Sequence, residues 1–195
     1  MGEKRKKILV VLGHPRRESL CGSLSRCYVE GAQTAGHEVH LLELGELAFD
    51  PILREQTRGE QSLEPDLVRA QQEIRWAEHL VFVYPIWWGG LPALLKGFLD
   101  RCLLPGFSFK YHEKDPFWDR LLTGRSAHLL VTMGSPPWYF RWVSRAPGHQ
   151  QMKRTILEFC GIKPVRVSNF GPVRRSRPEL RARWLDEARE LGRRA

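Results

Sequence analysis

The sequence contains few cysteines, and their spacing matches no common metal or redox motif. Its cysteines, Cys21, Cys27, Cys102 and Cys160, include neither a C-x-x-C pair nor zinc-finger spacing, so we expect no metal site. No apolar secretory segment precedes the first expected strand. These features together predict a reduced, cytoplasmic setting for the protein.

Long apolar runs and the common nucleotide-binding fingerprints are also missing. The longest uncharged stretch, residues 80–95, is interrupted by two prolines and a Gly-Gly pair, so we expect no membrane span. The loop after the first expected strand, residues 13–23, carries neither G-x-G-x-x-G nor G-x-x-x-x-G-K-[ST]. This argues against a dinucleotide-binding Rossmann site and against a P-loop.

The chain has an excess of positive charge, with a formal net charge of +9. Such a charge is compatible with nucleic acid, an anionic surface or a phosphorylated ligand. Much of the excess lies in residues 174–194, where apolar residues recur at helical spacing and predict a helix with a solvated basic face. Because no aromatic-studded basic sheet is visible, we expect a small-molecule partner and no nucleic acid.

Strand and helix signals alternate along the chain without a repeat or a linker, and 195 residues with 42% hydrophobic content suit one domain over residues 1–195. We expect strands at 8–12, 39–44, 79–84, 128–132 and 164–169, and helices at 20–35, 67–77, 92–102, 150–160 and 178–193. Two long excursions, 49–63 and 103–123, remain irregular in this prediction. The pattern predicts a three-layer α/β sandwich with a parallel five-stranded sheet in the flavodoxin-like order 2-1-3-4-5.

The most informative segment is the end of the third expected strand and the loop after it. The apolar run 81–84 is followed by Pro85, Trp87 and Trp88, and then by Gly89 and Gly90. Two indoles at the carboxyl end of a buried strand form a platform that suits a flat aromatic ligand. Either tryptophan alone could equally be a core residue, but the pair followed by Gly-Gly favours a binding loop.

Two further loops are expected at the same edge of the sheet. In the loop of residues 13–23, the start of a helix can hold a phosphate through free N–H groups, Ser19 can cap that helix, and His14 can make a polar contact. In residues 132–139, Gly134 permits close backbone approach, and Tyr139 follows a tryptophan that adds aromatic surface. Three loops at one edge predict a ligand site there.

These residues together resemble the flavodoxin-like NAD(P)H:quinone oxidoreductase family of the DT-diaphorase and modulator-of-drug-activity type. The resemblance runs from Ile8 to about Gly171, and its most specific part is the block Pro85 to Gly97. Supporting parts are the H-x(4)-S-L pattern that starts at His14, the Phe-Asp-Pro at 49–51 and the Phe-Cys-Gly at 159–161.

The resemblance implies two-electron hydride transfer from NAD(P)H through a bound flavin to a quinone-like acceptor, in a homodimer. FAD is favoured over FMN, because the two long excursions resemble those of FAD-type relatives. The implied catalytic residue is Tyr139, and the implied substrate-side residues are Phe109, Lys110 and Tyr111. The implied flavin-binding residues are His14, Ser19, Leu20, Cys21, Ser23, Pro85, Ile86, Trp87, Trp88, Gly89, Thr132, Met133, Gly134 and Ser135.

Two alternatives to the enzyme remain open at this point. One is a flavin-holding regulatory subunit, similar to the ancillary subunits of potassium efflux systems that share this fold, in which reductase activity is incidental. The other is an anion or nucleic-acid binder that has lost its flavin. The rate of NAD(P)H oxidation and the presence of a bound chromophore separate the three.

Overall fold

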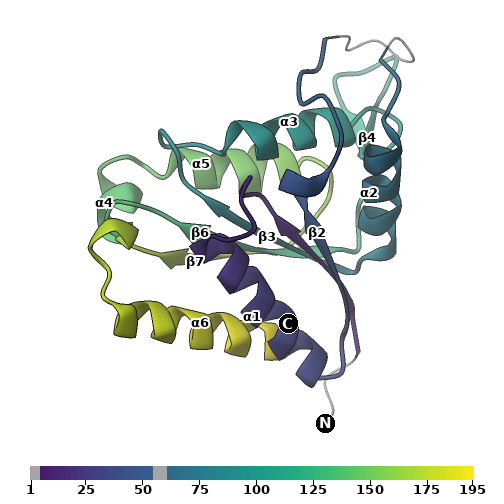
Figure 1. Cartoon of the computed structure of the whole chain (residues 1–195). Helices are drawn as coiled ribbons and strands as arrows, with labels where there is room; N and C mark the ends of the chain where they lie inside the picture. Colours follow the sequence, from purple (N-terminus) through teal and green to yellow (C-terminus); the bar gives the residue numbers. More distant parts are fainter. Residues whose placement is uncertain (1–4, 55–60) are drawn as a thin grey trace.

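The computed structural model describes residues 5–54 and 61–195, and its centre is a parallel five-stranded sheet in the order β2-β1-β3-β6-β7 (Figure 1). The strands run over Lys7–Leu12 (β1), Glu38–Glu43 (β2), His79–Pro85 (β3), Ser126–Thr132 (β6) and Val165–Phe170 (β7). Counting only the strands of this sheet, the order is the predicted 2-1-3-4-5, so the predicted fold class is confirmed.

Helices cover both faces of the sheet, as Figure 1 shows. Helices α1 (Leu20–Thr34) and α6 (Pro178–Arg193) pack on one face, against Ile8, Val10 and the side chains that share their side of the strands. Helices α2 (Pro65–Trp76) and α3 (Ala93–Cys102) and the segment 147–157 pack on the other, against Leu9 and Val11. The near-continuous apolar runs of the strands are explained by this double coverage.

Two glycines allow α1 and α6 to lie unusually close. A Cβ atom built on Gly31 would lie 1.9 Å from the carbonyl oxygen of Arg189, and one on Gly192 would lie 2.2 Å from that of Tyr28. Neither position can hold a side chain unless the helices separate. The predicted basic helix α6 therefore docks through Trp184, Ala188 and Gly192. Most of its arginines are exposed, but Arg189 pairs with Glu30 of α1 at 3.1 Å.

The segments that we expected to be irregular or simply helical contain additional structure. Within the excursion 103–123, β4 (Phe109–Tyr111) and β5 (Trp118–Arg120) pair as an antiparallel hairpin. The expected helix 150–160 instead begins earlier, as α5 (Pro147–Gln150), and continues as a π-helix, η2 (Gln151–Leu157). The loop after β6 contains a short helix, α4 (Pro137–Trp142). Short 3₁₀ turns, η1 (Leu44–Glu46) and η3 (Val173–Arg175), follow β2 and β7.

A buried arginine attaches the segment after η1 to α3. The side chain of Arg101 is 0% exposed, and it donates hydrogen bonds to the carbonyl oxygens of Asp50 at 2.9 Å and Ser62 at 3.0 Å. It also pairs with Glu64 at 2.8 Å. Part of the predicted excursion 49–63, residues 55–60, lies outside the described residues.

Candidate functional site

A cavity of about 390 Å³ lies at the carboxyl edge of the sheet, where the three predicted loops meet. This cofactor cavity is lined by residues from the loops after β1, β3, β6 and β7, namely His14, Arg16, Ser19, Leu20, Cys21, Pro85, Ile86, Trp87, Thr132, Met133, Gly134, Val173 and Arg174. In an open α/β sheet, a ligand is expected at this edge, near the point where the strand order reverses.

The first wall of the cofactor cavity is the loop between β1 and α1. The Ser19 hydroxyl caps α1 by accepting a hydrogen bond from the Gly22 N–H at 3.2 Å. Leu20 and Cys21 follow as the first two helical residues, whose N–H groups have no partner within a helix. These N–H groups and the positive end of the helix dipole form a site suited to a phosphate.

The second wall is the tight turn that follows β3. Trp87 and Gly90 exchange two backbone hydrogen bonds, of 3.1 and 3.0 Å, and the two residues between them both have positive φ, 51° at Trp88 and 79° at Gly89. These values match a type I′ turn. The turn separates the two indoles: Trp87 lines the cavity, and its ring meets that of His14 edge-on at 5.5 Å, whereas the side chain of Trp88 is fully exposed.

The third wall is the backbone after β6, which is held on both sides. The Thr132 carbonyl accepts the Ile86 N–H at 2.7 Å, and its hydroxyl lies 3.3 Å from the Cys21 sulfur. The Met133 N–H donates to the Phe170 carbonyl of β7 at 3.0 Å. These bonds connect the loops after β1, β3, β6 and β7, so the cavity is built on the rigid end of the sheet.

The loop after β7 supplies a fourth wall that our sequence analysis missed. Val173 and Arg174 line the cavity, and the Val173 N–H donates to the Met133 carbonyl at 2.9 Å. The predicted topology could have indicated this wall, because β7 is parallel to its neighbour and its carboxyl end therefore lies at the same edge. From the sequence, Arg174 belongs to the basic segment 174–194, for which we expect a solvated face.

The cavity is positively charged, and its other titratable groups are neutral. Arg16 and Arg174 both line it and supply guanidinium groups that match a phosphate. Burial lowers the pKa of His14, so its ring is neutral at pH 7 and acts as a hydrogen-bonding group. Burial raises the pKa of Cys21 to about 12, which leaves an unreactive thiol.

Several predicted site residues lie outside this cavity. Ser23 faces away along α1, where its hydroxyl accepts a hydrogen bond from Arg26 at 3.3 Å, and Ser135 is not among the lining residues. Trp88 and Gly89 line a different cavity of about 670 Å³ together with Arg145 and Arg154. Tyr139 is half-exposed on α4, edge-on to Trp138 at 5.8 Å.

The predicted substrate-side residues lie on the hairpin strand β4. Phe109 and Tyr111 line an apolar cavity of about 470 Å³, which α3 and the segment 155–160 complete, whereas Lys110 is exposed and does not line it. This cavity shares no lining residue with the cofactor cavity. The flavin-binding and substrate-side predictions therefore fall on separate parts of the described chain.

Neither a metal centre nor a bilayer-spanning helix is found in the described part of the chain. Among residues 5–54 and 61–195, no three His, Cys, Asp or Glu side chains are grouped so that they could hold a metal ion. None of the helices within those ranges is long and apolar enough to pass through a membrane.

The fold defines an open α/β protein with a cavity at the carboxyl edge of a parallel sheet, the edge at which proteins of this architecture bind their ligands. The chain belongs to the family of flavodoxin-like fold, whose sequence pattern matches residues 6–191. This match, together with the relatives described next, confirms the family resemblance found in the sequence.

Two curated relatives are oxidoreductases by name. The chain is 31% identical to a ribosyldihydronicotinamide dehydrogenase-like protein of Penicillium crustosum over 153 residues, which are 66% of the chain and 57% of that protein, so it spans little more than half of that relative. It is 29% identical over 210 residues to NAD(P)H dehydrogenase (quinone) 1 of Cavia porcellus, covering 92% of the chain and 74% of that protein.

Solved structures show the same fold. A protein of Streptococcus mutans, 26% identical, superposes with a TM-score of 0.84 and covers 97% of this chain and 100% of its own. An FMN-dependent NADH-azoreductase of Bacillus anthracis, solved with FMN, superposes with a TM-score of 0.78 over 96% of this chain and 98% of its own. At 20% identity, the second similarity shows the fold alone.

Proposed function

We propose that this chain is a flavin-dependent NAD(P)H oxidoreductase that transfers two electrons as a hydride to a quinone or a similar flat acceptor. The observation that carries this proposal is the cofactor cavity, where a helix start and two arginines lie beside Trp87 and an apolar backbone turn. The names of the relatives, which are NAD(P)H and ribosyldihydronicotinamide dehydrogenases, support it.

The residues of the cavity fit a flavin mononucleotide unit. The N–H groups of Leu20 and Cys21, together with Arg16 and Arg174, suit the phosphate, because all four are donors and none is paired with a carboxylate. The turn that begins at Trp87 and the strip of residues 132–134 supply backbone polar groups and apolar surface for the ring. Flavin supplies the hydride chemistry when bound.

The residues of this chain would hold and orient the reacting groups. The bonds from Thr132 to Ile86 and Cys21 hold two walls at a constant separation, which lowers the orientational cost of bringing donor and acceptor together. Neutral His14 can donate or accept a hydrogen bond without adding charge. The exposed Tyr139 hydroxyl is our candidate for a donor to the acceptor's oxygen atoms.

We propose that the protein acts as a homodimer in the cytoplasm. In this dimer, Phe109, Lys110 and Tyr111 contact the acceptor at the neighbouring subunit's site. We also propose that FAD is preferred over FMN. The homodimer is supported by large apolar side chains that are exposed on α4 and the hairpin, among them Trp138, Trp142 and Tyr111. The FAD preference rests on the two long excursions, 49–63 and 103–123. The structure of one fold neighbour contains FMN instead.

The two tryptophans of the turn provide a matched test. Trp87→Ala removes an indole that lines the cavity, whereas Trp88→Asn changes one that is fully exposed and keeps a residue type that tolerates positive φ. We expect Trp87→Ala to raise the flavin Kd at least about tenfold, or about 1.4 kcal/mol, and Trp88→Asn to leave it within about twofold. Equal effects of the two changes would refute this placement of the ring.

The reaction itself is tested on the purified protein. Mass measurement of the released chromophore distinguishes FAD from FMN, and the oxidation of NADH and NADPH is followed with and without a benzoquinone acceptor. We expect quinone-dependent turnover of about 1 per second or faster. A protein that binds neither flavin, or one that turns over far more slowly with every acceptor, would contradict the enzyme proposal.

A further inference from the structure

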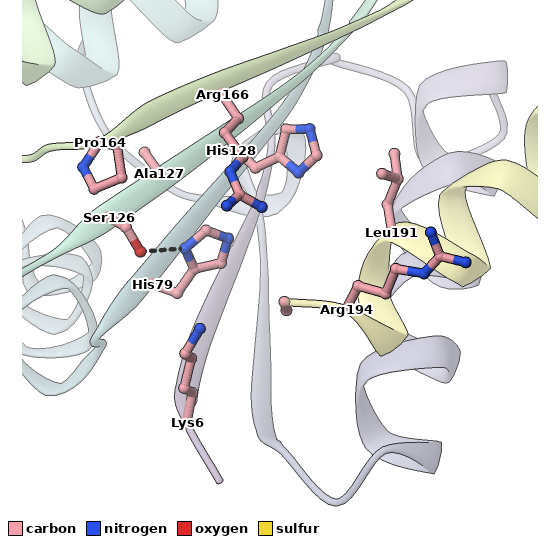
Figure 2. A pocket seen from close by; sticks show the side chains of 10 residues that line it. Lys6, His79, Ser126, Ala127, His128, Pro164, Arg166, Leu191 and Arg194 are labelled. Atoms are coloured by element: carbon pink, nitrogen blue, oxygen red, sulfur yellow. Dashed lines mark hydrogen bonds between the residues drawn. The ribbon is translucent and has the colours of Figure 1, made fainter. Parts of the chain in front are cut away.

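Another cavity, of about 600 Å³, lies at the opposite edge of the sheet, where the strands begin (Figure 2). It is enclosed by the starts of β1, β3, β6 and β7 and by the last turn of α6. This basic cavity is lined by Lys6, His79, Ser126, Ala127, His128, Pro164, Arg166, Leu191, Arg194 and Ala195. It shares no residue with the cofactor cavity and has no part in the proposed function.

The pleat of the strands gathers the basic side chains on one face. Side chains two residues apart point the same way along a strand, so Lys6, His79, His128 and Arg166 share the face that packs on α1 and α6 further along. They come from neighbouring strands in the sheet order. In Figure 2 the guanidinium group of Arg166 lies between the two imidazoles, and the side chain of Lys6 points toward them.

The histidine of β3 has an unpartnered atom in this cavity. His79 is only 6% exposed, and its Nδ1 lies 2.7 Å from the Ser126 hydroxyl oxygen, but its buried Nε2 has no hydrogen-bond partner among the described residues. Leaving a buried polar atom unpaired costs about 1–3 kcal/mol. A ligand oxygen that accepts a hydrogen bond from Nε2–H would remove that cost.

The charged groups that lower the pKa of this histidine are basic side chains. Burial, followed by the positive charges of His128, Lys6 and Arg166, lowers the pKa of His79 to about 3. Within residues 5–54 and 61–195, no Asp or Glu side chain lines the basic cavity, and neither Lys6 nor Arg166 forms an ion pair through its side chain. Arg194 alone has a partner there, Glu190, at 2.6 Å.

We propose that the basic cavity binds a small anion that bears a phosphate group. A guanidinium, an ammonium and an imidazole N–H are the donors that a phosphate's oxygens require, and Arg166 can present its planar fork to two of them. The cavity is far larger than a single phosphate group, which leaves room for an organic part against Leu191, Ala127 and Pro164. The ligand class is therefore a phosphate ester of a small polar molecule.

Histidine NMR on the protein as purified provides a readout specific to this site. Sodium phosphate or glycerol 3-phosphate is added to the protein, with sodium chloride at equal ionic strength as the control. The ring signals of the seven histidines are followed during each titration. We expect saturable shifts of the His79 and His128 signals with both phosphates, assigned with His79→Gln and His128→Gln. Shifts confined to His14, which lies in the cofactor cavity, or equal shifts with chloride, would overturn the proposal.

A pair of arginine variants makes the test sharper. Arg166→Gln should raise the apparent Kd for glycerol 3-phosphate at least about tenfold, while Arg166→Lys, which keeps the charge, should recover part of the affinity. Arg183→Gln removes the same charge from the exposed face of α6 and should leave the Kd unchanged. Equal losses in Arg166→Gln and Arg183→Gln, with both proteins folded by circular dichroism, would mean that only general electrostatics is being measured.

The two titrants also identify the form of the ligand. Tighter binding of glycerol 3-phosphate than of inorganic phosphate would support an ester with an organic part in the cavity. Equal affinity would support recognition of the phosphate group alone. Absence of saturable binding by either would refute the site.

Discussion

The start of α1 is so tightly packed against its own loop that one added methyl group should disturb the cofactor cavity. A Cβ atom on Gly22 would lie 1.9 Å from the carbonyl oxygen of Arg17, whereas ordinary contact begins at 3.4 Å. The Gly22→Ala variant must therefore displace that oxygen by about 1.5 Å. The same loop carries Arg16 and Ser19, so the displacement reaches the groups that we assign to the phosphate.

The expected cost follows from two opposing terms. Overpacking of this kind destabilises by about 1–3 kcal/mol, while alanine in place of glycine within a helix stabilises by about 1 kcal/mol. The Gly22→Ala protein should thus lose about 0–2 kcal/mol of stability and remain folded. Its flavin Kd should rise at least about tenfold, because the phosphate donors no longer keep their native positions. Quenching of flavin fluorescence on titration with the apoprotein measures this constant.

Gly31 on the same helix provides a matched control. Its Cβ would also lie 1.9 Å from a carbonyl oxygen, that of Arg189 on α6, far along α1 from the cofactor cavity. We expect Gly31→Ala to have a similar net cost of about 0–2 kcal/mol, which lowers the Tm by up to about 8 °C, and to change the flavin Kd less than twofold. If Gly22→Ala binds flavin normally, or if both variants lose affinity equally, the proposed phosphate site is wrong.

Two further predictions concern a buried arginine and two buried histidines. Arg101→Met should lower the free energy of unfolding by about 3–5 kcal/mol in urea denaturation, because it removes four hydrogen bonds and leaves Glu64 without its cationic partner; a loss below about 1 kcal/mol would contradict the tethering role. Burial lowers the pKa of His79 to about 3 and that of His128 to about 4, so below pH about 6.5 the unfolded chain takes up protons that the folded chain does not. Stability should therefore fall as the pH is lowered from about 6.5 to 4, by up to about 1.4 kcal/mol per pH unit for each histidine, and the fall should be shallower in His79→Gln; an unchanged slope in that variant would refute the assignment.

Much of the fold was predictable because its strands are buried on both faces. A strand such as Val10 and its neighbours is apolar throughout, which distinguishes a central parallel strand from an amphipathic one. The hairpin of β4 and β5 was missed, since each strand has only three residues and no strong alternation. The π-helix was also missed, because the apolar spacing of residues 150–160 also fits an ordinary helix.

The candidate site was predictable in part, for a reason that lies in the topology. Parallel strands bring the loops that follow them to one edge, so His14, Pro85 and Thr132 were correctly expected together. The sequence pattern does not predict which of the two adjacent indoles lines the cavity. That choice depends on the positive φ values of Trp88 and Gly89, which turn one side chain out of the cavity.

The sequence by itself determined the fold class, the edge of the sheet at which we propose a ligand site, and the residue types of the loops there. These properties follow from local patterns, namely apolar runs, turn residues and the donors that follow each strand. Only the tertiary structure placed Arg174 in the cofactor cavity and brought Lys6, His79, His128 and Arg166 together at the opposite edge. Both arrangements depend on the order of the strands and on the face of each pleat, which join residues far apart in the chain.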